Sequence, residues 1–151
     1  MNHDFARCFT KELDSLAKEL ALCDDALLWK ALPGITNTIG VLTQHLIGNL
    51  NHFIGATLGN TGYVRNRDRE FSEQYLSKAE MISGLEQTAA MVEQVLNALT
   101  EEDLQKTYPL EPFGYAMTTN HLLLKLANHL GYHAGQVNYL RRISMNQTGQ
   151  P

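Results

Sequence analysis

The stretch LLLKLANHLGYHAGQVNYLRRI, residues 122–143, decides how the chain folds and where its chemistry lies. Its apolar residues recur every three or four positions, which is the spacing of one face of an α-helix packed in a bundle. The same spacing places His129, His133 and Gln136 among the leucines of that face. A buried polar side chain without a partner costs about 1–3 kcal/mol. We therefore expect these three side chains to meet partners inside the bundle.

Three earlier segments show the same helical spacing of apolar residues, at 9–27, 35–56 and 81–99. Ser77 and Glu80 form the pattern of a capping box, in which each side chain accepts a hydrogen bond from the other residue's backbone N–H. This pattern predicts the start of the third helix. No segment shows the alternating pattern of a strand over a useful length.

The four segments together predict an all-α protein that folds as an up-down-up-down four-helix bundle. We expect a single domain from residue 1 to 146, because 151 residues of which 44% are hydrophobic are enough for one core. Residues 147–151 are expected to form a loose tail. The two longer connections, 59–75 and 107–117, are expected to lie outside the bundle helices, and Thr118 or Thr119 to cap the fourth helix.

Charge and hydropathy exclude several classes of partner. The net charge is −4, so the overall field repels a phosphate backbone, and we expect no nucleic-acid partner. No run of apolar residues is long enough to cross a membrane, and the first residues lack the apolar block of a secretion signal. These features predict a cytoplasmic protein with no membrane partner.

The histidines predict a metal site. His129 and His133 are four residues apart, so one helix face can offer both rings to the same ion. The second helix carries His45 and His52 on nearly the same side, with Asn49 between them. Three neutral imidazoles leave a coordination position open, which is typical of a catalytic ion. Spacing alone does not choose between His45 and His52, and it also allows an ordinary hydrogen-bonded histidine pair.

Other polar residues have simpler interpretations. HLGYH lacks the glutamate of the HExxH motif, so the general base of a metalloprotease is missing. His3 and His121 are expected to be ordinary hydrogen-bonded residues. In the loop VRNRDREF, residues 64–71, Arg65 and Arg67 can line the mouth of a site for an anionic substrate. The alternative is a solvated loop whose arginines pair with Asp68 and Glu70.

Two motifs resemble a known family. HLGYHAGQVNYLRR, residues 129–142, is similar to the last-helix motif of the DinB/YfiT-like superfamily, and TQHLIGNLNHFIG with TGYVRNRDREFS resembles the second helix and loop of one of its branches. The resemblance implies a four-helix bundle, often dimeric, with a divalent metal held by His45, His129 and His133. His52 then becomes a neighbour of the site, and Gln136 a hydrogen-bond partner beside it.

The resemblance also implies a range of functions, because relatives include thiol transferases and a mycothiol-dependent isomerase. Our first hypothesis is a metal-dependent, thiol-dependent S-transferase acting on a small molecule, in which the ion lowers the pKa of a low-molecular-weight thiol. A metal-dependent hydrolase is the runner-up. The third hypothesis is a non-catalytic stress-response bundle that binds a metal or ligand, with a site closed to solvent or blocked by a side chain. Zinc or nickel is favoured over manganese because neutral imidazoles suit both.

Overall fold

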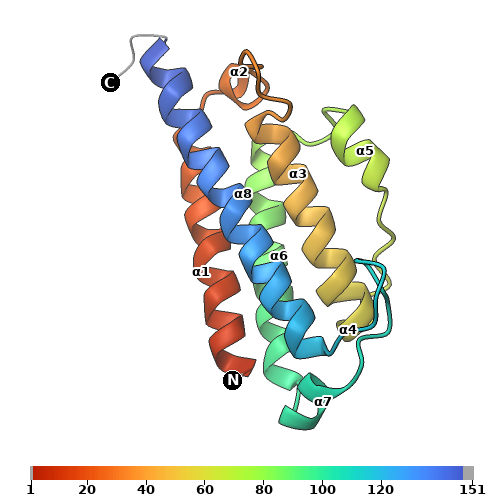
Figure 1. Cartoon of the computed structure of the whole chain (residues 1–151). Helices are drawn as coiled ribbons and strands as arrows, with labels where there is room; N and C mark the ends of the chain where they lie inside the picture. Colours follow the sequence, from red (N-terminus) through yellow and green to blue (C-terminus); the bar gives the residue numbers. More distant parts are fainter. Residues whose placement is uncertain (1, 148–151) are drawn as a thin grey trace.

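The computed structural model describes the backbone of residues 2–147 and the side chains of residues 3–146. Four long helices form a bundle (Figure 1): α1 (Asn2–Ala21), α3 (Ile39–Leu50), α6 (Lys78–Ala98) and α8 (Thr119–Gln147). Five shorter segments complete the helices: α2 (Asp25–Leu28), η1 (Asn51–Ala56), α4 (Thr57–Gly59), α5 (Arg67–Ser72) and α7 (Glu101–Gln105). The described residues form no strand beyond one isolated bridge, between Thr107 and Thr118. The all-α prediction is confirmed.

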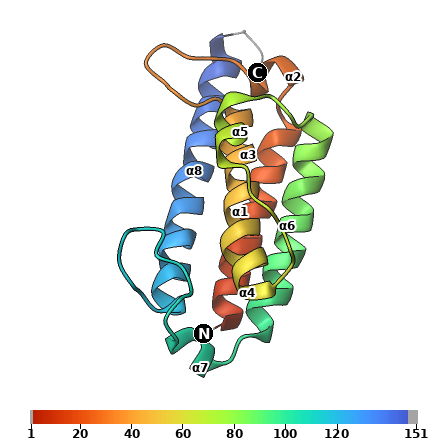
Figure 2. The ribbon, with the colours of Figure 1, turned by 90° about the vertical axis from the view of Figure 1, so that its right-hand side faces the viewer.

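The directions of the helices differ from the predicted up-down-up-down order. In Figures 1 and 2, α1 and α8 run one way and α3 and α6 run the other way. At one end, Lys78 at the start of α6 donates to the carbonyl of Cys23 just after α1, so these two helices are antiparallel. Further along, Asn51 donates to Thr88, and Gly55 faces Met91, so α3 and α6 advance together.

The long connection between α4 and α6 explains this difference. Figure 2 shows it returning along the outside of the bundle, and α5 forms near its upper end. Because the chain travels back the length of α3 before α6 begins, α6 can repeat the direction of α3. The spacing of apolar residues is the same whichever way a helix runs, so it does not encode this order.

Local signals define most helix ends correctly. Ser77 and Glu80 form the reciprocal capping box at the start of α6, and Thr118 accepts a hydrogen bond from the backbone N–H of His121 at the start of α8. The second helix begins later than its apolar stripe predicts. Thr38 caps α3, so Ile35 lies in the preceding loop and is 49% exposed.

The core is a continuous cluster of apolar side chains contributed by all four long helices. On α8 the fully buried positions include Leu123, Leu130 and Val137. His129 and His133 are only half-buried, so the polar positions lie at the edge of this face, toward α3, and not at its centre. The row of apolar residues on α8 therefore packs in the core, and the polar residues beside it face the space between α8 and α3.

No helix among residues 2–147 is long and apolar enough to span a membrane. The predicted tail, 147–151, lies outside the described residues except for the backbone of Gln147, which ends α8.

Candidate metal centre

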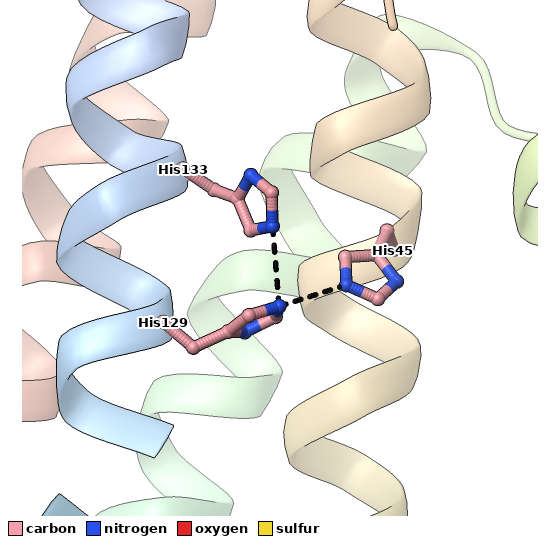
Figure 3. Close-up of side chains that lie close together, drawn as sticks. All are labelled: His45, His129 and His133. Atoms are coloured by element: carbon pink, nitrogen blue, oxygen red, sulfur yellow. Dashed lines mark hydrogen bonds between the residues drawn. The ribbon is translucent and has the colours of Figure 1, made fainter. Parts of the chain in front are cut away.

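Three imidazoles meet between α3 and α8 (Figure 3). His129 Nε2 lies 3.1 Å from His45 Nε2 and 3.1 Å from His133 Nε2. One ring nitrogen from each residue lies within 4.8 Å of the others. Two nitrogens bound to one ion at 2.0–2.1 Å are separated by about 3.0–3.4 Å, depending on the geometry. The spacing of these nitrogens therefore fits a single divalent ion.

The outer nitrogens of two rings face acceptors. His45 Nδ1 lies 3.0 Å from Glu70 Oε2, and His133 Nδ1 lies 2.6 Å from Gln136 Oε1. An oxygen acceptor places the ring proton on Nδ1 and leaves the Nε2 lone pair free. The Nε2 lone pairs of His45 and His133 then both face Nε2 of His129. A proton on that nitrogen can form a good hydrogen bond with only one of them. An ion at this point satisfies all three nitrogens.

Burial favours the neutral form of the two histidines on α8. The pKa of His129 is lowered to about 4 by burial first and then by the neighbouring His133 and His45. Burial also lowers the pKa of His133, although the hydrogen bond to Gln136 acts in the opposite direction. Neutral rings at pH 7 carry the lone pairs that a metal ion needs.

Sequence reasoning did not assign Glu70 to the site. Its side chain is 1% exposed, and Arg65 donates to both carboxylate oxygens, at 2.6 Å from Nε and 2.8 Å from Nη2. Burial raises the pKa of Glu70, but hydrogen bonds from Arg65 and His45 outweigh it and lower the pKa overall. Glu70 is thus a buried carboxylate anion. Its only signal in the sequence is its place in an arginine-rich loop.

The arginine loop combines the two interpretations of its sequence. Arg65 pairs with Glu70, as a salt-bridged loop predicts, but Asp68 forms no ion pair with another described residue. Arg69 pairs instead with Glu73, at 2.8 Å. Arg65 and Arg67 both line the cleft above the histidines.

The three histidines line a cleft of ≈ 720 Å³. One part of its wall is apolar, with Phe53, Phe71 and Phe113 among its residues, and the other part is polar. The full lining consists of Asn37, His45, Asn49, His52, Phe53, Arg65, Arg67, Phe71, Leu110, Glu111, Pro112, Phe113, Leu126, His129 and His133. A cleft of this size accommodates a small organic molecule.

Two of the other polar residues singled out in the sequence, Asn49 and His52, line the cleft. Asn49 lines the cleft with a buried Oδ1 that has no hydrogen-bond partner among the described residues. His52 also lines the cleft but lies outside the group of three converging histidines, and its ring packs against Phe53. His3 and His121 are exposed and lie outside both the cluster and the cleft lining.

Comparisons with known proteins agree with the fold. The model of a family described as a protein of unknown function (DUF1572) matches residues 5–149. A DinB-like protein from Bacillus cereus ATCC 10987 has a similar structure, with a TM-score of 0.68 at 24% identity over 97% of this chain and 92% of that chain. No curated protein matches the sequence significantly.

A mutant of a mycothiol-dependent maleylpyruvate isomerase is also similar, with a TM-score of 0.69 at 16% identity. The match covers 91% of this chain but 60% of the isomerase, so the isomerase has a substantial part with no counterpart here. These likenesses confirm the fold that the sequence motifs indicated. The chain belongs to the DUF1572 family, and its bundle is a DinB-like fold.

Proposed function

We propose that the chain is a metal-dependent enzyme in which His45, His129 and His133 hold one divalent ion and the cleft above them binds a small substrate with a thiol. The convergence of three Nε2 atoms, two of them held by acceptors at Nδ1, carries this proposal. Zinc and nickel are the favoured ions because the ligands are neutral imidazoles.

The open cleft supports an enzyme over a closed metal-binding bundle. A closed site has its ligands sealed from solvent, whereas His129 and His133 are half-buried and line a cleft of ≈ 720 Å³. Phe53, Phe71 and Phe113 provide apolar contact area, and the exposed guanidinium of Arg67 lies 5.1 Å from the ring of Phe71. This combination suits a small molecule with an apolar part and a negative charge.

The cleft lining lacks most of the side chains that commonly act as nucleophiles, which favours a thiol as co-substrate. Among the described residues that line the cleft there is no serine, threonine, cysteine, tyrosine or lysine. A bound thiol can then supply the nucleophile, and one solved protein of similar fold is a mycothiol-dependent isomerase. A bound divalent ion supplies a lowered pKa to a thiol that it contacts, so thiolate is available at neutral pH.

The first test is the metal content of protein purified without a metal-affinity step. We expect one equivalent of zinc or nickel per chain by elemental analysis, either as purified or after loading and desalting. A chain that retains no ion under either condition contradicts the proposal.

Substitution assigns the ligands. His45→Ala, His129→Ala and His133→Ala should each weaken zinc binding by more than the roughly 10- to 100-fold expected when only an outer hydrogen-bond partner is lost. Gln136→Ala should have the smaller, outer-partner effect. His3→Ala and His121→Ala are matched controls, and His52→Ala tests the alternative ligand on the same helix. Loss of binding in His52→Ala with retention in His45→Ala would exchange their roles.

The reaction itself is tested with metal-loaded protein, a panel of low-molecular-weight thiols and a panel of small electrophiles, including anionic ones. Turnover that requires a thiol supports the transferase. Turnover without any thiol supports a hydrolase instead. Stoichiometric metal with no turnover on either panel favours the non-catalytic bundle.

A further inference from the structure

A carboxylate reaches the candidate metal centre from outside the bundle. α5 lies against α3, and its Glu70 is the one buried side chain among the aspartates, glutamates, lysines and arginines that the structure describes. Placing a carboxylate there requires a partner for each oxygen. Arg65 bonds both oxygens, and the remaining contact of Oε2 is with His45 Nδ1 at 3.0 Å.

We propose that Glu70 is a positioning residue, which accepts the Nδ1–H of His45 and so aims the Nε2 lone pair of His45 at His129 and His133. This inference rests on the proposed function and adds a residue to it. A hydrogen bond from a ligating histidine to a carboxylate fixes the ring's tautomer and orientation and makes the ring a better donor to a metal. Glu70 does not line the cleft, so it acts only through His45.

The surrounding contacts select this tautomer. Arg65 Nη2 also lies 3.3 Å from His45 Nδ1, and a hydrogen bond from it needs a lone pair on Nδ1. The contact with Glu70 is shorter and involves a charged acceptor, and Nη2 already donates to Glu70 Oε2 at 2.8 Å. The proton therefore belongs on Nδ1, between the ring and the carboxylate.

Gly48 makes the approach of the carboxylate possible. It lies on α3 one turn after His45, and a Cβ added to it would overlap Oε1 and the carboxyl carbon of Glu70. Arg65 holds that carboxylate by two hydrogen bonds, so Glu70 cannot turn aside without losing them. A glycine in the middle of a helix is unfavourable unless another chain segment needs the space.

Gln44 holds the segment that carries Glu70. Its fully buried amide donates to the carbonyls of Glu70 and Glu73, at 3.3 and 2.9 Å, and its Oε1 accepts from the backbone N–H groups of Tyr75 and Leu76, both at 3.1 Å. The backbone around Glu70 is thereby fixed to α3 next to His45. Positioning of this kind requires such a rigid support.

The direct test is Glu70→Gln, with Glu73→Gln as its matched control on the same segment. In Glu70→Gln the two donors of Arg65 compete for one amide oxygen, which turns the NH₂ group toward His45 Nδ1. We expect His45 to shift toward the Nε2–H tautomer in metal-free protein, as seen in the ring ¹⁵N and ¹³C chemical shifts of labelled samples. Zinc affinity, measured by calorimetry, should fall by about 10- to 100-fold.

A second variant displaces the carboxylate without changing its chemistry. Gly48→Ala should push Glu70 from its place and produce the same tautomer shift and loss of zinc affinity. Gly131→Ala is the matched control, because a Cβ there meets nothing within 4 Å. Circular dichroism checks that each variant is folded. If Glu70→Gln does not fold, Gly48→Ala tests the role of Glu70 by itself.

The outcomes separate this inference from the proposed function. If the natural chain binds no zinc or nickel, the proposed function fails, and the tautomer of His45 alone decides the role of Glu70. If the natural chain binds zinc and both variants keep its affinity and tautomer, only the role of Glu70 is overturned. An equal loss of affinity in Glu73→Gln would point to overall charge and also overturn it.

Discussion

The pair α1 and α6 meets through buried apolar side chains, whereas the pair α3 and α8 meets through imidazoles. On α1, Phe9, Leu13 and Leu16 are at most 1% exposed, and polar contacts with α6 lie at the ends, such as His3 with Asn97. On α3 and α8, the histidines lie well inside the helices, and their rings meet between the two helices (Figure 3). All four helices contribute to the core, and the difference indicates that the α3–α8 contact in addition supplies the candidate site.

The largest effect is expected from damage to the apolar pair. Phe9→Ala removes a fully buried ring and should lower the free energy of unfolding by about 3–5 kcal/mol. Urea unfolding followed by circular dichroism measures this loss. The zinc affinity of the folded fraction should stay unchanged, since Phe9 does not line the cleft. Loss of affinity in a folded variant would show that the two pairs are not independent.

Loading the other pair with metal should stabilise the protein by a smaller amount. An ion that binds only the folded state adds about 2.7 kcal/mol when its concentration is one hundred times the dissociation constant. Thermal unfolding with zinc and with a chelator measures the shift. The helical signal should persist after chelation, because the apolar core does not depend on the ion. A helical signal that vanishes with the chelator contradicts this division of roles.

Removal of the site should leave the bundle intact. His129→Leu combined with His133→Leu replaces two half-buried rings next to Leu126 and Leu130 with aliphatic side chains. We expect no zinc binding and a melting temperature equal to or higher than that of the metal-free natural chain. An unfolded double variant would mean that the site region contributes to the core more than the comparison allows.

The smallest effect concerns pH in the metal-free protein. The pKa of His129 is about 4 in the folded chain, whereas an unperturbed histidine has a pKa of 6.5, so between these pH values the unfolded chain binds more protons. Stability therefore rises with pH across this window, and it is lost as the pH falls from 6.5 toward 4. Urea titrations at several pH values measure the slope. His129→Leu should flatten it, and an unchanged slope in that variant would assign the pH dependence to other groups.

The sequence predicted the helices and their ends better than their arrangement. The stripes on 81–99 and 122–143 and the capping box at Ser77 all correspond to helical structure that the chain forms. The predicted order of helix directions was wrong, because the observed order depends on the connection 60–77, which has no apolar stripe. The start of α3 was wrong because the side chain of Thr38 caps the helix after Ile35.

The site was predictable where its residues share a helix face. The spacing of His129 and His133 predicted that the two rings meet, and the family resemblance, more than spacing, selected His45 over His52. Glu70 escaped prediction because its contact with His45 spans 25 residues and depends on the short helix α5. A glycine at position 48 was the only trace of that contact on α3, and a helical glycine has several explanations.

The two helices that form the site are distant in the chain, since His45 and His129 are 84 residues apart. Contacts of such long separation are slow to form, because closing the intervening loop costs entropy before any contact compensates it. The site is complete only after α8, the last helix, has docked on α3. Interactions that form after the rate-limiting step of folding slow unfolding and leave the folding rate nearly unchanged. If the site forms after that step, an ion bound there would lengthen the lifetime of the folded protein without speeding its folding.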